Sequence, residues 1–349
     1  CFGCSVDELT RMPEEGARHL NGDGVSHREK DANEVRLSAP RELFRLTESI
    51  SELTERAIAE WSMTKGESEK DQAPWTKEPG GSSWPFQPDT WILTDAHERA
   101  PLLSSVRESL DTNGSLSSIF APEVSSLYRL EILAETLLTF LNSLSDGIIT
   151  ASVWQQMEPH MITREKAKSP SLSWEETQAW VLESLAYSPA HSVSFTFVTF
   201  MLARIANEVA PVPSTTKSNP STSNTKKQNG SADKSTDSST SQEPDSSSDT
   251  TSPTAPTPAS AAAFISGGSF RRKARSLESD FASSSAANAT ARRQAVEAAL
   301  AGIFARVLIS AAVPVPAKEK ERRASEERRR SIIEPFLKMI GVDERGPSG

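Results

Sequence analysis

A long tract of the chain contains almost no side chain that could be buried in a protein core. Between residues 212 and 288 the sequence is dominated by Ser, Thr, Pro, Asn, Asp and Lys. Such a segment lacks the apolar surface that would offset the loss of backbone entropy on folding. We therefore predict a long disordered insertion over 212–288, flanked on both sides by ordinary globular sequence.

Apolar residues on both sides of the insertion recur every three or four positions, which is the spacing typical of amphipathic helices. The clearest stripe begins at Pro40, because Pro suits a first helical turn, and runs from Leu43 to Trp61. The pattern predicts an all-α domain. Its other expected helices cover 102–110, 125–144, 173–185 and 189–211, then a stretch from about 289 to Pro314, and a final helix that ends at Gly341.

Three local features make these helix predictions more specific. Ser173 and Glu176 have the spacing of a capping box, in which each side chain bonds the backbone amide of the other residue. The segment 189–211 is apolar on nearly every side, so we expect a central helix with neighbours on all faces. In the final helix, Glu326 and Arg330 are spaced to form an ion pair across one turn.

A Gly- and Pro-rich stretch interrupts the helical pattern at about 65–88. It has three tryptophans in or next to it: Trp75, Trp84 and Trp91. Three tryptophans in a loop could form a ligand cage. Packing of the loop on the surface of the domain is the interpretation we favour.

Charge and composition exclude several classes of function. The net charge of −9 argues against a nucleic-acid binder, which usually has a basic surface. The basic runs 271–275 and 318–330 are better interpreted as solvated, and Glu interrupts the second. No run of about 18 uncharged apolar residues occurs, so no transmembrane segment is predicted.

The cysteines and histidines predict neither a disulfide framework nor a metal site. The cysteines are Cys1 and Cys4, in a CFGC motif without the βαβ pattern of a redox protein, and the five histidines are scattered. No cofactor is expected, and a reducing compartment is the default. Because the sequence begins at Cys1 instead of Met, we expect it to be a fragment of a longer protein.

Several short motifs occur in a specific order along the chain. They are Cys1-Phe-Gly-Cys-Ser-Val-Asp-Glu-Leu-Thr-Arg-Met12, Pro40-Arg-Glu-Leu-Phe-Arg-Leu46, Val106-Arg-Glu-Ser-Leu-Asp-Thr112 and Leu133-Ala-Glu-Thr-Leu-Leu-Thr-Phe-Leu-Asn-Ser-Leu144. This order resembles the RhoGAP-like helical domain that ends OCRL-type (oculocerebrorenal) inositol polyphosphate 5-phosphatases. The first motif is similar to the exit of the immunoglobulin-like ASH domain that precedes it.

The resemblance implies a RhoGAP-like helical bundle with a long disordered insertion, and it divides the chain. Its implied parts are the end of an ASH domain at 1–15, a linker at 16–37, the first part of the RhoGAP-like domain at 38–211, the insertion at 212–288, the last helices at 289–341 and a tail at 342–349.

Active RhoGAP domains insert an arginine finger that neutralises charge on the transferred phosphoryl group, and that finger is worth about 10³–10⁵ in rate. By alignment with the family, the finger position falls on Thr94 or Asp95, and neither can supply a positive charge. Arg99 is the nearest alternative and would need a shifted loop. The resemblance therefore implies a domain without GTPase-activating activity, and no catalytic residue is identified.

Family positions that contact the GTPase also depart from the active pattern. The Lys and Arg positions align with Leu138 and Asn142, and two Pro positions align with Ser145 and Gly147. A later Asn and Pro align with Ala299 and Arg306. We take Leu138, Asn142, Ala299 and Arg306 as the candidate groove positions.

The partners implied by the resemblance are a small GTPase of the Rho, Rac or Rab type, or short helical peptides from endocytic adaptors. The expected setting is small-GTPase signalling in the cytoplasm, peripherally on endosome or Golgi membranes, after an upstream inositol polyphosphate 5-phosphatase domain. Two alternatives stay open: an active GTPase-activating protein that uses Arg99, and a helical scaffold without a GTPase partner.

Overall fold

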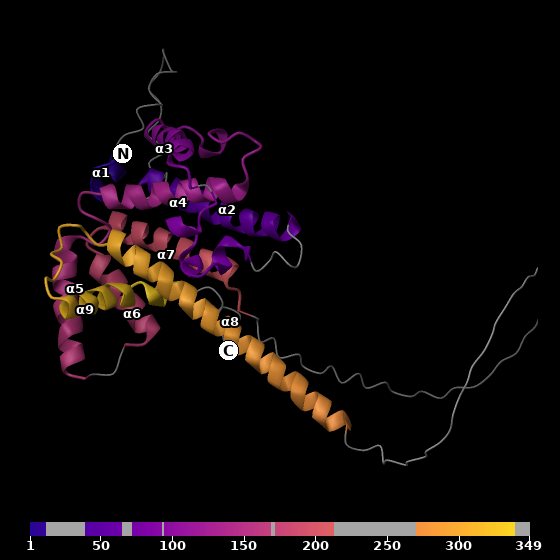
Figure 1. Ribbon diagram of the computed structural model, residues 1–349. Coiled ribbons are helices and arrows are strands. Elements are labelled where there is room, and N and C mark those ends of the chain that lie inside the picture. Colours follow the sequence, from indigo (N-terminus) through magenta and orange to yellow (C-terminus); the bar gives the residue numbers. More distant parts are fainter. Residues whose placement is uncertain (12–38, 65–71, 93, 169–171, 213–269, 339–349) are drawn as a thin grey trace, which may run out of the picture. The chain divides into compact units, whose positions relative to one another are not determined.

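Helix accounts for 73% of the described residues and no strand occurs among them, which confirms the predicted all-α class. The computed structural model describes residues 1–11, 39–64, 72–92, 94–168, 172–212 and 270–338, without the side chains of 270–286 (Figure 1). The helices are α1 (Val6–Arg11), α2 (Arg41–Thr64), α3 (Ala96–Asp111), α4 (Ser126–Ser143), α5 (Ala151–Lys166), α6 (Trp174–Leu185), α7 (Pro189–Val209), α8 (Phe270–Val307), α9 (Glu319–Ser331) and α10 (Glu334–Leu337).

Short 3₁₀ turns complete the element order: η3 (Pro74–Thr76), η4 (Gly81–Ser83), η5 (Pro88–Thr90) and η6 (Leu116–Ser118). One compact unit is made from Cys1–Ser214 and Ser283–Gly349, and it contains every helix except the first turns of α8. The predicted insertion at 212–288 lies largely outside the described residues. The whole of the linker at 16–37 and of the tail at 342–349 also lies outside them.

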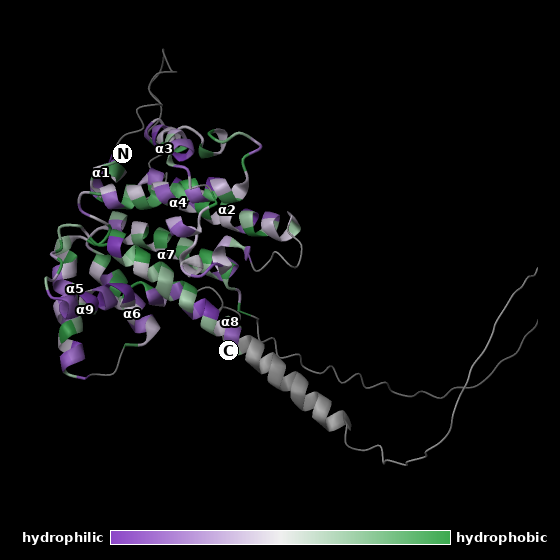
Figure 2. Ribbon diagram, in the orientation of Figure 1, coloured by the Kyte–Doolittle hydropathy of each residue, from purple (hydrophilic) through white to green (hydrophobic). Residues whose placement is uncertain are grey.

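The core of this unit is built on α2, α4 and α7. The predicted stripe on α2 is buried, since Leu43, Leu46 and Ile50 have no exposed surface. α2 packs against both α4 and α7. Figure 2 shows hydrophobic residues along these three helices and a mostly hydrophilic α9. The 3.6-residue period therefore identified the face of α2 that enters the core.

α7 is central, but the prediction that all its faces are covered is wrong for one stripe. Phe195 is fully buried and meets the ring of Phe336 edge-on at 5.0 Å. Phe197 lies only partly buried against Phe44 of α2, with ring centroids 5.3 Å apart. Phe200 is 56% exposed. The period of the sequence places these aromatic side chains on different faces, and no described element covers the face with Phe200.

The tryptophan-rich segment is part of the core instead of a surface loop. Trp84 and Phe86 are buried, and Phe86 meets Phe304 of α8 with centroids 4.8 Å apart. Trp75 packs on both Trp84 and Trp61, at 4.9 and 6.0 Å. The expected packing on the domain surface is therefore wrong for Trp84 and Phe86, which are buried in the core. The tryptophan rings of the described part pack on one another instead of forming a cage, while residues 65–71 lie outside the described part.

α6 begins as its sequence predicts, whereas α5 was missed. The side chains and amides of Ser173 and Glu176 exchange both hydrogen bonds of the capping box, at 2.8 and 3.1 Å. α5 begins after Thr150, whose hydroxyl accepts from the amide of Val153. Its apolar stripe is short and Pro159 lies inside it, so the helical period was not evident.

Two boundaries near the end of the chain differ from the prediction. α8 begins at Phe270, within the segment predicted to be disordered up to 288. Its early residues include Ala and Arg, which favour helix even without an apolar stripe, although Ser is commoner there. The single final helix is instead α9 followed by α10, because Pro335 begins a new helix and cannot donate a backbone bond within the old one. Ile340 and Gly341 lie outside the described residues.

α8 is joined to α7 and α10 through Arg293, whose residue surface is 6% exposed. Its guanidinium bonds Glu297 at 2.7 Å, Asn207 of α7 at 3.4 Å and the carbonyl of Leu337 at 3.1 Å. A buried charge of this kind is tolerated because each of its three nitrogens has an acceptor and a carboxylate lies beside it. This network anchors the described part of α8 to the domain.

The segment that follows α4 pairs with the segment that follows α8 through an isolated parallel β-bridge between Ile149 and Ile309. The amide of Ile149 donates to the carbonyl of Leu308 at 2.8 Å, and the amide of Ser310 donates to the carbonyl of Ile149 at 2.9 Å. Gly147, at φ +68°, approaches the backbone of Ser310 closely. The C-terminal ends of α4 and α8 are therefore brought to the same junction.

The first residues of the chain pack on this helical domain. Val6 and Leu9 of α1 are in its core, and Phe2 meets Phe140 of α4 edge-on at 5.6 Å. Asp7 accepts a hydrogen bond from Ser188 at 3.0 Å. Residues 1–11 belong to the same compact unit as the helices, because their apolar side chains contribute to its core. They are the described part of the segment 1–15, for which the end of an ASH domain stays a prediction.

Candidate functional site

The position expected for an arginine finger lies at the start of α3 and carries no positive charge. Thr94 and Asp95 are both exposed. The carboxylate of Asp95 accepts a hydrogen bond from the amide of His97 at 2.8 Å and caps α3. This is a common use of Asp before a helix. Asp95 thus contributes a negative charge and a structural bond at the place where a finger would need a guanidinium.

Arg99, the alternative finger, is buried in the first turns of α3. Its side chain is 5% exposed. Its Nε–H donates to Oε2 of Glu135 at 3.0 Å, and its Nη2 contacts the same oxygen. The centre of the guanidinium lies 3.8 Å from the ring centroid of Trp91. A charge-assisted bond and a cation–π contact therefore hold Arg99 against the domain.

Glu131, one turn before Glu135 on α4, holds the segment that precedes α3. It is fully buried, and both its carboxylate oxygens lie 3.1 Å from the amide of Ile92. Sequence reasoning did not identify these two carboxylates. The available signal was a pair of Glu residues four apart within the otherwise apolar stretch of α4. In such a helix, a buried charge indicates a specific partner.

The four candidate groove positions lie on two helices, and two of the positions come to the same end of the domain. Leu138 is half-buried on α4 and Ala299 is half-buried on α8. Asn142 and Arg306 are exposed in the last turns of α4 and α8. These are the ends that meet at the Ile149–Ile309 bridge. The structure thus brings Asn142 and Arg306 toward one junction and leaves Leu138 and Ala299 farther back along their helices.

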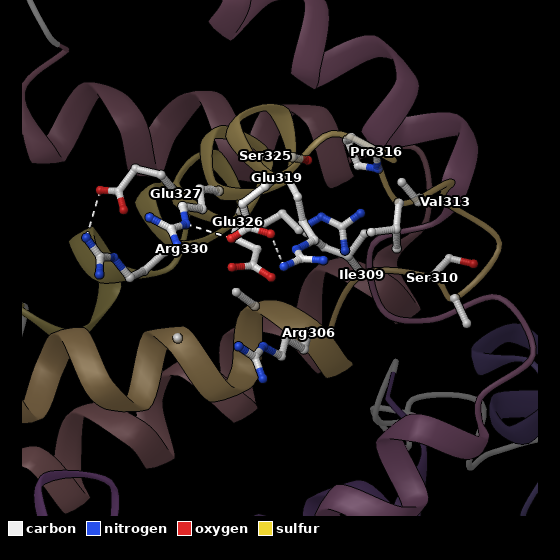
Figure 3. Close-up of a pocket in the computed structure, with 17 residues that line it drawn as sticks. Arg306, Ile309, Ser310, Val313, Pro316, Glu319, Ser325, Glu326, Glu327 and Arg330 are labelled. Carbon is white, nitrogen blue, oxygen red and sulfur yellow. Dashed lines mark hydrogen bonds and ion pairs between the residues drawn. The ribbon is translucent and has the colours of Figure 1, made fainter. Parts of the chain in front are cut away.

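A pocket of about 910 Å³ opens between the end of α8 and the length of α9, and Arg306 lies on its wall. Figure 3 shows Arg306 on α8, opposite Glu319, Glu326 and Arg330 of α9, with the loop between the helices at one end. The pocket is within the size range of small-molecule sites, about 300–1,000 Å³. Its charged lining residues are Arg306, Glu319, Arg322, Arg323, Glu326, Glu327, Arg329 and Arg330.

Some of these charges are paired with one another. Glu319 bonds Arg322 and also Arg323, the latter at 2.7 Å. Arg330 bonds Glu327 at 2.7 Å and forms an ion pair with Glu334 at 2.9 Å. The predicted pair between Glu326 and Arg330 is therefore not the one that forms. Arg330 reaches Glu327 and Glu334 instead, because the break before α10 places Glu334 beside it.

Arg329 differs from its neighbours on α9 because its side chain turns toward the interior. Its guanidinium centre lies 5.6 Å from the ring centroid of Trp154 on α5. Its Nε is buried and, within the described residues, has no hydrogen-bond acceptor. Burial lowers the pKa of Arg329, while the carboxylates of Glu158 and Glu326 act in the opposite direction. The lowered pKa shows that burial outweighs the attraction of these carboxylates.

Among the residues with described positions, no group of three or more His, Cys, Asp or Glu side chains is arranged to hold a metal ion. Cys1 and Cys4 are free thiols, each partly buried. Across the same described stretches, no helix combines the length and apolar character needed to cross a bilayer.

No protein-family model, curated protein or solved structure matches this chain. The resemblance to the OCRL-type domain therefore rests on the motifs at 1–12, 40–46, 106–112 and 133–144. The described residues add the geometry at the positions that those motifs single out. The most informative of these are the finger position and its neighbour Arg99.

Proposed function

We propose that this chain is a small-GTPase-binding module of the RhoGAP-like kind that does not accelerate GTP hydrolysis. The module would be of the type that ends OCRL-type inositol polyphosphate 5-phosphatases. The observation that supports the absence of catalysis is the burial of Arg99 between Trp91 and Glu135. A finger must instead present its guanidinium to a nucleotide bound by another protein.

The chemistry of GTP hydrolysis explains why this observation supports the proposal. Negative charge on the transferred phosphoryl group must be neutralised in the transition state. Asp95 would add repulsion there. To act as a finger, Arg99 would have to leave its bond to Glu135 and its contact with Trp91. Exposing it would also leave the carboxylate of Glu135 without this partner.

The proposal is tested with the full chain and a GTP-loaded Rac- or Rho-type GTPase. We expect saturable binding, measured by interferometry, and single-turnover GTP hydrolysis within about twofold of the intrinsic rate. A stimulation that approaches the ~10³-fold effect of an arginine finger would refute the silent module. The variant Thr94→Arg is the matched gain-of-function arm, because it restores a guanidinium at the aligned position.

A second candidate function is the binding of short helical peptides, and one exposed surface favours it. Phe44 and Phe197 pack on each other at the surface between α2 and α7, and Phe200 is 56% exposed nearby on α7. Arg204 of α7 bonds Glu55 of α2 farther along the same pair of helices. Amphipathic helices bind apolar surfaces of their partners through a few large side chains.

Peptide binding predicts that Phe200→Ser weakens the binding of an amphipathic peptide with aromatic anchors, measured by fluorescence anisotropy. Because Phe200 is exposed, the fold should tolerate this substitution, which circular dichroism would verify. The GTPase assay does not depend on the result of this peptide-binding test. If neither a GTPase nor such peptides bind the intact chain, the helical scaffold becomes the better description.

A further inference from the structure

We propose that the pocket between α8 and α9 binds a small molecule that carries two or more phosphate groups. The inference does not depend on the proposed function, because it follows from the charges and shape of the pocket. The pocket is built entirely from residues between Gly302 and Arg330, within the unit that contains the core.

Every basic residue that lines the pocket is an arginine. They are Arg306 on α8 and Arg322, Arg323, Arg329 and Arg330 on α9. Lys318 and Lys320 occur at the start of the same helix but do not line the pocket. A guanidinium presents a planar fork of donors that matches the oxygens of a phosphate, whereas a lysine acts as a point charge. The lining therefore favours oxyanion recognition over simple attraction of negative charge.

Within the described structure, two of these guanidinium groups, one from each helix, have unused hydrogen-bond donors, although that of Arg329 also lies against Trp154. No hydrogen bond or ion pair to Arg306 or Arg329 is found within the described ranges, whereas Arg322, Arg323 and Arg330 each contact a carboxylate. The buried Nε of Arg329 also lacks an acceptor in that part of the chain. A buried donor without a partner is costly. An oxyanion between the two arginines would supply acceptors to both.

The size and the lining of the pocket favour a ligand with more than one phosphate group. About 910 Å³ is far more than a single phosphate fills. Arg306 on α8 and Arg330 on α9 stand on different walls (Figure 3). Ala305, Ile309 and Val313 contribute an apolar part of the lining. A ligand with phosphates at separate positions on a compact scaffold would reach both walls and cover this apolar part.

The carboxylate of Glu326 would repel an anion in the pocket, so removing its charge should strengthen anion binding. Its carboxylate favours the charged form of Arg329. Within the described residues it has no hydrogen bond or ion pair of its own. Replacing it with Gln keeps the shape of the side chain and removes its negative charge. Binding of an anion should then become tighter.

The experiment is calorimetric titration of the intact chain with tripolyphosphate at low ionic strength. We expect one saturable site and about tenfold weaker binding for Arg306→Ala, the equivalent of one charge-assisted hydrogen bond. Arg306→Lys should also weaken binding, because it keeps the charge and loses the fork. Glu326→Gln should tighten it. The matched control is Arg292→Ala, which removes an exposed arginine from the same helix outside the pocket.

Arg306 is exposed, so its substitution should leave the fold intact, and thermal unfolding of each variant checks this. Equal weakening by Arg306→Ala and Arg292→Ala would overturn the proposal, since it would show binding to the general surface charge. Absence of tripolyphosphate binding would overturn it as well. A second arm uses vesicles that contain phosphatidic acid. Binding to vesicles without binding to free tripolyphosphate would replace the small-molecule site with a membrane surface.

Discussion

Substitution of Gly147 by Ala should destabilise the domain strongly, because the new methyl group has no room. Gly147 has a φ of +68°, and a Cβ built there lies 2.7 Å from both Cα and N of Ser310. The atoms in the way belong to the backbone. The bonds between Ile149 and the chain at Leu308 and Ser310 prevent that backbone from moving aside.

The magnitude follows from two contributions. A non-glycine residue in the left-handed region costs about 1–2 kcal/mol, and overpacking in a fixed environment costs about 1–3 kcal/mol. Together they predict a loss of about 2–5 kcal/mol in the free energy of unfolding. For a domain of this size, each kcal/mol lowers the melting temperature by about 2–4 °C. A fall on the order of 10 °C is therefore expected.

Gly302→Ala is the matched control, since a Cβ at Gly302 meets nothing within 4 Å. Gly302 lies inside α8, where Ala is favoured over Gly by about 1 kcal/mol, so this variant should be slightly more stable. Urea unfolding followed by circular dichroism measures both variants. A Gly147→Ala protein within about 0.5 kcal/mol of the parent, the usual range for a surface substitution, would refute the claim that this junction is rigid.

Three further predictions test the buried charges and one phenol. Arg99→Ala should leave GTP hydrolysis by a bound GTPase at its intrinsic rate, while lowering the stability of the domain by about 1–3 kcal/mol through loss of the bond to Glu135. Arg293→Ala should cost about 3–5 kcal/mol in urea unfolding, because it leaves a buried carboxylate unpaired, whereas the exposed Arg292→Ala should have little effect. Burial raises the pKa of Tyr187 in the folded protein. The protonated phenol therefore contributes fully to the free energy of unfolding below its ordinary pKa of about 10, and this contribution is lost as the pH rises through the pKa of the folded state. Tyr187→Phe should reduce the loss of melting temperature above that pH, and an unchanged alkaline profile would contradict the assignment.

Local signals in the sequence were sufficient where a helix is specified by its own residues. The stripe on α2 and the capping box at Ser173 depend on residues a few positions apart, so both were predictable. α5 was missed because Pro159 and a short apolar stripe obscure its period. Its stability comes from packing of Trp154 and Met157 into the core, and that packing depends on distant parts of the chain.

The state of Arg99 shows why the candidate site needed the structure. In the sequence, Arg99 is the cation nearest the aligned finger position. Its burial is decided by Glu135, which lies 36 residues away and one helix later. A one-dimensional alignment compares positions and cannot tell whether a guanidinium is exposed or paired. The sequence disfavours Arg99 as a finger because of its position, and its buried bond to Glu135 is a separate argument against it.

The charges of the α8–α9 pocket were also not predictable from the sequence alone. The run 318–330 was interpreted as one solvated helix face, because Arg and Glu alternate in it. In the fold, Ser325 and Arg328 instead face α5, where both bond Glu158, while other arginines of α9 face the end of α8. The numbers of Arg and Glu follow from the sequence, but their pairing does not. The proposed anion binding depends on which guanidinium groups of the pocket stay unpaired. Within the described residues these are Arg306 and Arg329, which come from different helices.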